Sequence, residues 1–186
     1  PIARDKMLQA LASGKGDIAA ANLTVTPERQ KLVDFSAPVY PEVTEVLVTG
    51  PASPKVASVE DLSGKEVFVR KSSSYHESLV ALNRQLAAKK KPPVVIKAAP
   101  EALNDEDLIE MVAAGLIPLT IMDRHVADFW KQVFPRMGVR EDIALRKGGA
   151  IAWAMRKNSH GLKAALDDFV VRHGKGTTKG NTILNR

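Results

Sequence analysis

Between residues 51 and 147 the sequence alternates three times between a short apolar run and a longer amphipathic run. The apolar runs, 66–70, 94–98 and 116–122, have the length of buried β-strands, and the runs between them place apolar residues at helical spacing. Parallel strands need crossover connections of about a dozen residues or more, which helices usually supply. The pattern therefore predicts an α/β fold, with a mostly parallel sheet and helices on both faces.

Local signals place the ends of these helices. Residues 74–77, Ser-Tyr-His-Glu, have the form of a capping box that opens a helix to about Ala88. Asn104 is placed to cap a second helix, which Gly115 ends, and Asp123 opens a third.

Two breaks divide the chain, Gly-Pro-Ala-Ser-Pro at 50–54 and Lys-Gly-Gly at 147–149. The simplest account is a two-lobed protein, in which residues 1–50 and 148–186 form lobe one and residues 51–147 form lobe two. Lobe one is expected to hold helices at 4–13 and 159–173, strands at 17–21, 42–49 and 150–155, and a surface tail from Gly174.

Composition restricts the classes of function. The net charge of +6 suits an acidic ligand, but only 5% of residues are aromatic and no basic–aromatic motif occurs, so no nucleic-acid partner is expected. Cysteine is absent and the four histidines lack metal-binding spacing, so we expect neither a metal nor a cofactor. No nucleophile turn supports Ser-His-Asp catalysis, and the chain is not expected to be an enzyme.

The richest functional run is residues 22–40. Thr26 is placed to cap a short helix, and Pro27 takes the first helical position, where its missing N–H costs nothing. Arg29 then lies close to hydroxyls and to the backbone N–H groups of a helix start. Because a guanidinium in such surroundings is a good receptor for a carboxylate, the run predicts a protein that binds small anionic or zwitterionic molecules.

With these features the chain resembles the bacterial extracellular solute-binding proteins of family 3, the amino-acid-binding receptors of ABC importers. The resemblance rests on residues 11–17, 22–29 and 33–36 and on the return segment 152–156, and it covers nearly the whole chain. It implies the two-lobed fold of type II periplasmic binding proteins, a periplasmic location, and a ligand enclosed in the inter-lobe cleft by hinge closure.

The resemblance also assigns two charged residues to the ligand. Arg29 matches the family arginine that binds the ligand α-carboxylate, and Asp123 matches the acidic residue that pairs with the α-ammonium. Together they would recognise a zwitterion from opposite lobes. The alternatives are a surface arginine on a short helix and an aspartate that only caps a helix.

Five polar residues complete the predicted site. Ser72, Ser73 and Ser74 precede a helix, where backbone N–H groups and the helix dipole attract anions, although capping alone would explain Ser74. Asn22 and Thr24 stand where the family uses small polar residues to hold the ligand, and local turn capping is the alternative for both.

Residues 72–79 and 174–181 also resemble the solute-binding module of membrane-bound lytic murein transglycosylases of the F type. That resemblance implies a separate catalytic domain, which cleaves peptidoglycan, after Arg186. The expected ligand is then a muropeptide or one of its amino acids, and the partner is a fused lytic domain of a membrane-anchored protein. In the importer case the partner is an ABC permease.

One departure from the family supports a different hypothesis. Family members start with a strand–helix–strand unit that would precede Pro1, so we expect a processed or truncated product whose lobe one is incomplete. The chain would then be a structural or regulatory module of a cell-wall enzyme that binds no ligand. Exposed sheet edges would also favour a dimer formed by strand exchange.

Overall fold

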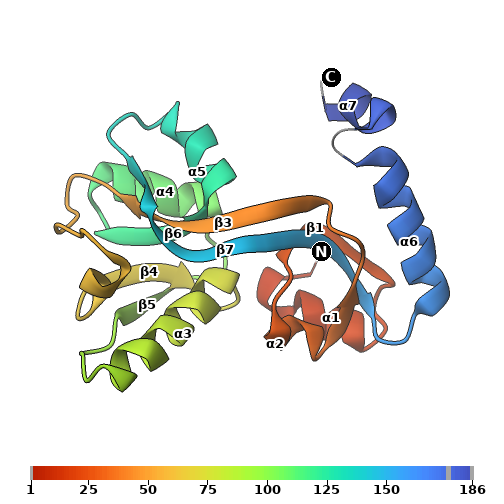
Figure 1. Ribbon diagram of the computed structural model, residues 1–186, viewed down its shortest axis with the longest axis horizontal. Helices are drawn as coiled ribbons and strands as arrows, with labels where there is room; N and C mark the ends of the chain where they lie inside the picture. The colour runs from red at the N-terminus through yellow and green to blue at the C-terminus, as the bar shows by residue number, and fades with distance from the viewer. Residues whose placement is uncertain (1, 175–176, 185–186) are drawn as a thin grey trace. The chain divides into compact units, whose positions relative to one another are not determined.

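The computed structural model describes residues 2–174 and 177–184 (Figure 1). The chain divides into two compact units, Pro1–Glu42 with Gly148–Arg186 (unit 1) and Val43–Lys147 (unit 2). It enters unit 2 within β3 (Tyr40–Thr49) and returns within β7 (Gly138–Arg156). The lobe boundaries inferred from sequence, near 50 and 148, stay a prediction, and each unit is described by itself.

Unit 2 is built around three parallel strands in which β4 (Glu66–Arg70) pairs with both β5 (Val95–Ala99) and β6 (Leu119–Asp123). The crossover from β4 to β5 contains α3 (Ser74–Ala88), and that from β5 to β6 contains α4 (Asp105–Ala114). These two connections run in opposite directions across the sheet, so right-handed crossovers place α3 and α4 on opposite faces, as Figure 1 shows. The short η2 (Val59–Leu62) precedes β4, and α5 (Arg124–Lys131) follows β6.

Three other strand pairs are antiparallel, which corrects the expectation of a mostly parallel sheet. In unit 2, β3 pairs antiparallel with β6. In unit 1, β1 (Ile18–Thr24) and β2 (Val33–Phe35) both pair antiparallel with β7. The hydrogen-bonded order is β1-β7-β3-β6-β4-β5, with β2 on β7. The alternation of strands and helices identifies only strands joined by crossovers, and β1, β2, β3 and β7 are not joined in that way.

A second correction concerns the strand expected at 150–155, because β7 begins at Gly138 and contains the residues of the predicted break at 147–149. β7 spans 19 residues, and Gly148 within it has a φ of +67°, in the left-handed region that glycine adopts readily. The strand therefore accommodates an irregular residue without ending. The chain does change units between Lys147 and Gly148, but it does so within one strand.

Each unit has its own apolar core. The core of unit 2 packs fully buried residues of the strands against those of α3 and α4, among them Leu47, Leu79, Ile109 and Ile121. Unit 1 has a smaller core of mostly small or β-branched side chains, which includes Leu11, Val33, Phe35, Ala152 and Ala154. Burial of apolar surface at about 25 cal/mol per Å² is the main stabilising contribution in both.

The helices of unit 1 are η1 (Arg4–Lys6), α1 (Met7–Ala12), α2 (Pro27–Gln30), α6 (His160–His173) and α7 (Thr178–Leu184). The last of these corrects the expected surface tail, because part of that tail is helical. Gly174 lies before it, and residues 175–176 and 185–186 of the predicted tail lie outside the described residues.

Gly50 provides a test of the packing between the end of β3 and α4. A Cβ atom at this position would lie 2.0 Å from the carbonyl oxygen of Val112, a backbone atom of α4. We expect Gly50→Ala to lower the free energy of unfolding by about 2 kcal/mol or more, because neither backbone can move aside easily. Urea unfolding followed by circular dichroism measures this.

The control is Gly161→Ala in α6, where a Cβ atom meets nothing within 4 Å and stability should not fall. Equal stability of both variants would contradict the packing.

Candidate ligand-binding site

The predicted carboxylate receptor lies in unit 1, where β1 leads into α2. Thr26 Oγ1 accepts a hydrogen bond from the backbone N–H of Arg29 at 3.2 Å, and Pro27 occupies the first helical turn, which confirms the predicted cap. Arg29 is 8% exposed, and its Nη1 donates to the carbonyl oxygen of Thr24 at 2.9 Å. This contact orients a buried guanidinium, a group that stays charged and whose planar geometry matches a carboxylate.

Of the two other polar residues predicted in unit 1, one lies beside Arg29. Thr24 is buried at the end of β1, and its carbonyl oxygen is the acceptor just described. Asn22 lies on the same strand and is exposed. The roles of Thr24, Asn22 and Arg29 in ligand binding stay predictions.

The predicted serines lie at the start of α3 in unit 2, with one correction. The helix cap is Ser73, whose Oγ accepts from the backbone N–H of His76 at 3.2 Å and donates to the carbonyl oxygen of Arg70 at 2.7 Å. Ser74 is instead the first helical residue and is buried. Each of the three consecutive serines is a candidate cap by sequence. The hydrogen bond from Ser73 to the carbonyl oxygen of Arg70, which the sequence does not reveal, accompanies the cap at Ser73.

Ser72 already binds a carboxylate that belongs to the chain itself. Its backbone N–H donates to Glu101 Oε1 at 3.0 Å, and its hydroxyl donates to Oε2 at 2.6 Å. Glu101 follows β5, and Ser72 follows β4, so both lie at the carboxyl ends of parallel strands. This is the edge at which open α/β sheets bind ligands. The turn therefore holds one carboxylate of the chain itself, and the roles of Ser72, Ser73 and Ser74 in ligand binding stay predictions.

Asp123, the predicted ammonium receptor, ends β6 at the same edge. It occupies the N-cap position of α5, yet its side chain makes no capping hydrogen bond, so helix capping does not explain it. It is 5% exposed, its backbone N–H donates to the Tyr75 hydroxyl at 3.1 Å, and its Oδ1 has no hydrogen-bond partner. A buried carboxylate oxygen without a partner is costly in a folded protein and requires an explanation.

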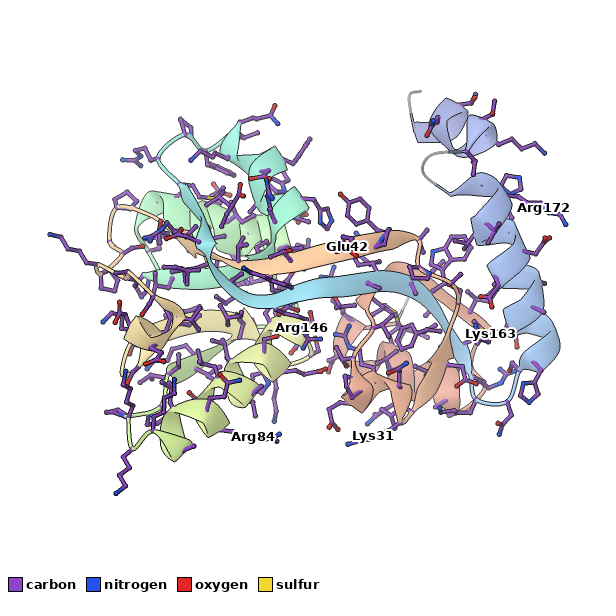
Figure 2. The ribbon with its side chains drawn as sticks, in the orientation of Figure 1. Lys31, Glu42, Arg84, Arg146, Lys163 and Arg172 are labelled. Atoms are coloured by element: carbon purple, nitrogen blue, oxygen red, sulfur yellow. The ribbon has the colours of Figure 1, made fainter. Side chains whose placement is uncertain are left out.

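A second buried carboxylate, Glu45, lies opposite Asp123 in the β3–β6 register. Glu45 is fully buried; its Oε2 accepts from the Ser78 hydroxyl, and its Oε1 lies 3.7 Å from Nε of Arg146. Arg146 Nε also donates to Ser78 Oγ at 3.2 Å, and Figure 2 shows this arginine on β7 close to α3. We name Glu45 and Asp123 the acidic pair.

Sequence reasoning missed three residues of this region, Glu45, Ser78 and Arg146, and it regarded Tyr75 as a packing residue or a wall of the pocket. The signal for Glu45 was a carboxylate inside the apolar run Val43–Val48, a position where an unpaired glutamate is rarely buried. Arg70 is buried and forms an ion pair with Asp105 at the start of α4.

Burial and neighbouring charges change the acid–base properties of the region. The pKa of Asp123 is raised from 3.8 to about 7, mainly by burial and then by the charges of Glu45 and Asp105. Burial, followed by the charges of Asp123 and Asp105, raises the pKa of Tyr75 well above its ordinary value, so its hydroxyl keeps its proton. A cation placed beside Asp123 would favour its ionised carboxylate and lower the raised pKa.

Within residues 2–174 and 177–184, no group of three or more His, Asp or Glu side chains is arranged to hold a metal ion. Among the helices formed by these residues, none combines the length and apolar character needed to cross a bilayer.

The fold, with the buried Arg29 in unit 1 and the buried Asp123 in unit 2, defines a solute-binding module. The model of the bacterial extracellular solute-binding proteins, family 3, matches residues 1–179, and the chain belongs to that family. It is similar to the membrane-bound lytic murein transglycosylase F of Maricaulis maris (strain MCS10), with 35% identity over 161 residues, 86% of this chain and 33% of the relative. The corresponding protein of Desulfosudis oleivorans is 29% identical over 170 residues, 89% of this chain and 34% of the relative. The chain thus spans about a third of the length of these relatives.

Solved structures show the same fold. An ancestral arginine-binding protein bound to arginine matches with a TM-score of 0.80 at 24% identity, covering 100% of this chain and 77% of that protein. The amino acid ABC transporter substrate-binding protein AbpA of Streptococcus pneumoniae, bound to L-arginine, matches with a TM-score of 0.69 at 26% identity, covering 92% and 68%.

The raised pKa of Asp123 predicts a dependence of stability on pH. Between pH 3.8 and about 7 the folded state binds more protons than the unfolded state, so the stability contribution present below this window is lost as pH rises through it. We expect Asp123→Asn, which carries no charge, to equal the wild type at pH 4 and to exceed it by about 4 kcal/mol at pH 8. Urea unfolding at both pH values measures this difference.

The matched control is Asp128→Asn in α5, where the carboxylate is 45% exposed and pairs with Arg124. This variant should show no such gain at pH 8. If Asp123→Asn also shows none, Asp123 is ionised in the folded protein without penalty and the description of its surroundings is wrong.

Proposed function

We propose that this chain binds an amino-acid-like zwitterion, with Arg29 receiving the ligand carboxylate and Asp123 receiving its ammonium group. The observation that carries the proposal is the buried Oδ1 of Asp123, which has no hydrogen-bond partner and does not cap its helix. A ligand ammonium supplies the missing donor and the compensating charge at once. The buried Arg29, oriented by Thr24, supplies the complementary charge.

Several similarities support this ligand class. The chain belongs to a solute-binding family, and two of the similar structures are bound to arginine. The curated relatives are murein transglycosylases, which favours a muropeptide or one of its amino acids as the natural ligand. In that setting the module would act in the periplasm as the sensing part of a longer, membrane-anchored protein that carries a separate lytic domain. An importer receptor that delivers solute to an ABC permease is the other setting.

Isothermal titration calorimetry with L-arginine, L-glutamine, L-cysteine and a disaccharide-peptide muropeptide tests the proposal. We expect at least one of them to bind, and we expect Arg29→Lys and Asp123→Asn each to weaken binding at least tenfold. The first loses the bidentate geometry and the second the charge, and each such charged hydrogen bond contributes about 1.5–3 kcal/mol.

The control variant for Arg29 is Lys31→Ala, which removes an exposed lysine next to α2 that pairs with Glu28. It should bind as the wild type does. Binding that is unchanged in both site variants would show that the ligand is held elsewhere, and the absence of binding by every compound would refute the proposal.

The contact between Ser72 and Glu101 favours a second function, a structural or regulatory module that binds no ligand. Because Glu101 holds both the N–H and the hydroxyl of Ser72, the turn predicted to receive the ligand carboxylate has an internal one. If a ligand carboxylate replaces Glu101, the glutamate is a competitor. If nothing replaces it, the contact is a permanent part of the fold.

Glu101→Gln separates these two functions. The amide keeps the size of the side chain but removes the charge, so a competing ligand should bind about fivefold more tightly than in the wild type. Calorimetry with the best ligand of the panel measures the change, and Glu106→Gln, at an exposed position in the first turn of α4, is the control. An unaltered affinity would mean that the ligand does not use Ser72.

A further inference from the structure

Glu45 and Asp123 are directly opposite residues of an antiparallel strand pair, so their side chains share one face of the sheet. Such residues have Cβ atoms about 4.5–5.5 Å apart, and like charges in this position are unfavourable. Both residues are buried, at 0% and 5% exposure, so water does not screen the repulsion effectively. Two carboxylates in this arrangement require a cation or a proton.

The protein supplies only part of the compensation. Ser78 donates to Glu45 Oε2, and the nearest cation, Arg146, remains 3.7 Å from Oε1 because its Nε donates to Ser78. One oxygen of each carboxylate, Glu45 Oε1 and Asp123 Oδ1, is buried without a hydrogen bond. The acidic pair therefore retains two acceptors for donors that the described residues do not provide.

The other charged and titratable groups that face Asp123 do not neutralise it. They include Glu45 on β3, Tyr75 on α3, Asp105 at the start of α4 and Arg146 on β7. Asp105 is engaged by Arg70, and Tyr75 is neutral. With both members of the acidic pair ionised, a single arginine faces two carboxylates, and one negative charge stays uncompensated.

We propose that Glu45 is a specificity-determining residue that completes, with Asp123, a two-carboxylate subsite for a primary ammonium group. This inference rests on the proposed function and extends it. A primary ammonium has three N–H donors, enough for both unpartnered oxygens, whereas a quaternary ammonium has none. The subsite therefore selects ligands with an unblocked amino group.

Binding of the ligand replaces a proton on Asp123 by the ammonium group of the ligand. Without ligand, the carboxyl of Asp123 holds a proton below its pKa of about 7, and this proton relieves its repulsion with Glu45. When the ligand ammonium enters, the O–H bond of Asp123 breaks and its proton passes to the solvent. The subsite then contains two carboxylates and one ammonium in place of two carboxylates and one proton, so its net charge is unchanged.

Calorimetry of L-arginine binding in two buffers with different ionisation enthalpies measures this proton. We expect close to one proton released per ligand at pH 6 and almost none at pH 8, on either side of the pKa of about 7. In Glu45→Gln the release at pH 6 should fall, and the affinity at pH 8 should fall at least tenfold. The control is Glu66→Gln in β4, an exposed glutamate paired with Lys97, which should leave both quantities unchanged. Unchanged proton release and affinity in Glu45→Gln would overturn the proposal.

A second measurement keeps the inference testable if L-arginine fails to bind. Carboxyl carbon shifts of Glu45 and Asp123, recorded by NMR, are followed during titration with methylammonium chloride and, separately, with tetramethylammonium chloride. We expect both carboxyl signals to shift with methylammonium and neither to shift with tetramethylammonium. This result would support the two-carboxylate subsite even if the proposed binding of a zwitterion is wrong. No response, or an equal response to both salts, would overturn it. Unfolding of Glu45→Gln does not affect this test, because it uses the wild-type chain.

Discussion

The repulsion between two buried carboxylates is the interaction on which the chemistry of unit 2 depends. Glu45 and Asp123 face each other because β3 pairs antiparallel with β6 in a register that aligns them. The surrounding groups satisfy the two residues only in part, since Ser78, Arg146 and Tyr75 leave one oxygen of each without a hydrogen bond. Such an arrangement costs stability, and costs of this kind are concentrated at functional sites.

The parallel strands of unit 2 bring this pair to the same edge as the anion-binding turn. Because β4 and β6 are neighbours and run in the same direction, Arg70, the serines that follow it and Asp123 all come at carboxyl ends of strands. Ser72 holds the carboxylate of Glu101 at this edge, and Arg70 holds that of Asp105. Unit 1 contributes a separate receptor, a buried arginine whose helix cap and orientation are fixed within ten residues of chain. The chain belongs to the solute-binding family, and the roles of Arg29, Ser72 and Asp123 in ligand binding stay proposals.

Local sequence signals predicted the features that depend on neighbouring residues. The strand at 66–70 agrees with β4, Thr26 caps α2, and Gly115 ends α4 in the left-handed conformation. Features that depend on contacts between distant segments were missed or wrong. The antiparallel pairing of β3 with β6 and the length of β7 follow from which strands meet, and the cap at Ser73 follows from a contact with Arg70.

The candidate site shows the same division. Asp123 was predicted from its place between an apolar strand and a helix, and Arg29 from the run around it. Their roles as ligand receptors came from resemblance to a family and are still to be measured. Glu45 could not be assigned a role from sequence, because an isolated glutamate in an apolar strand does not reveal which residue lies opposite. Only the strand register identifies Asp123 as its neighbour.

A crystal structure of the chain with a bound amino acid or muropeptide would test the central claim most directly. The account predicts a ligand ammonium within hydrogen-bond distance of both Asp123 Oδ1 and Glu45 Oε1, with the ligand carboxylate on the guanidinium of Arg29. A ligand bound without contact to either member of the acidic pair would contradict it, because the two buried oxygens would then have no function in recognition.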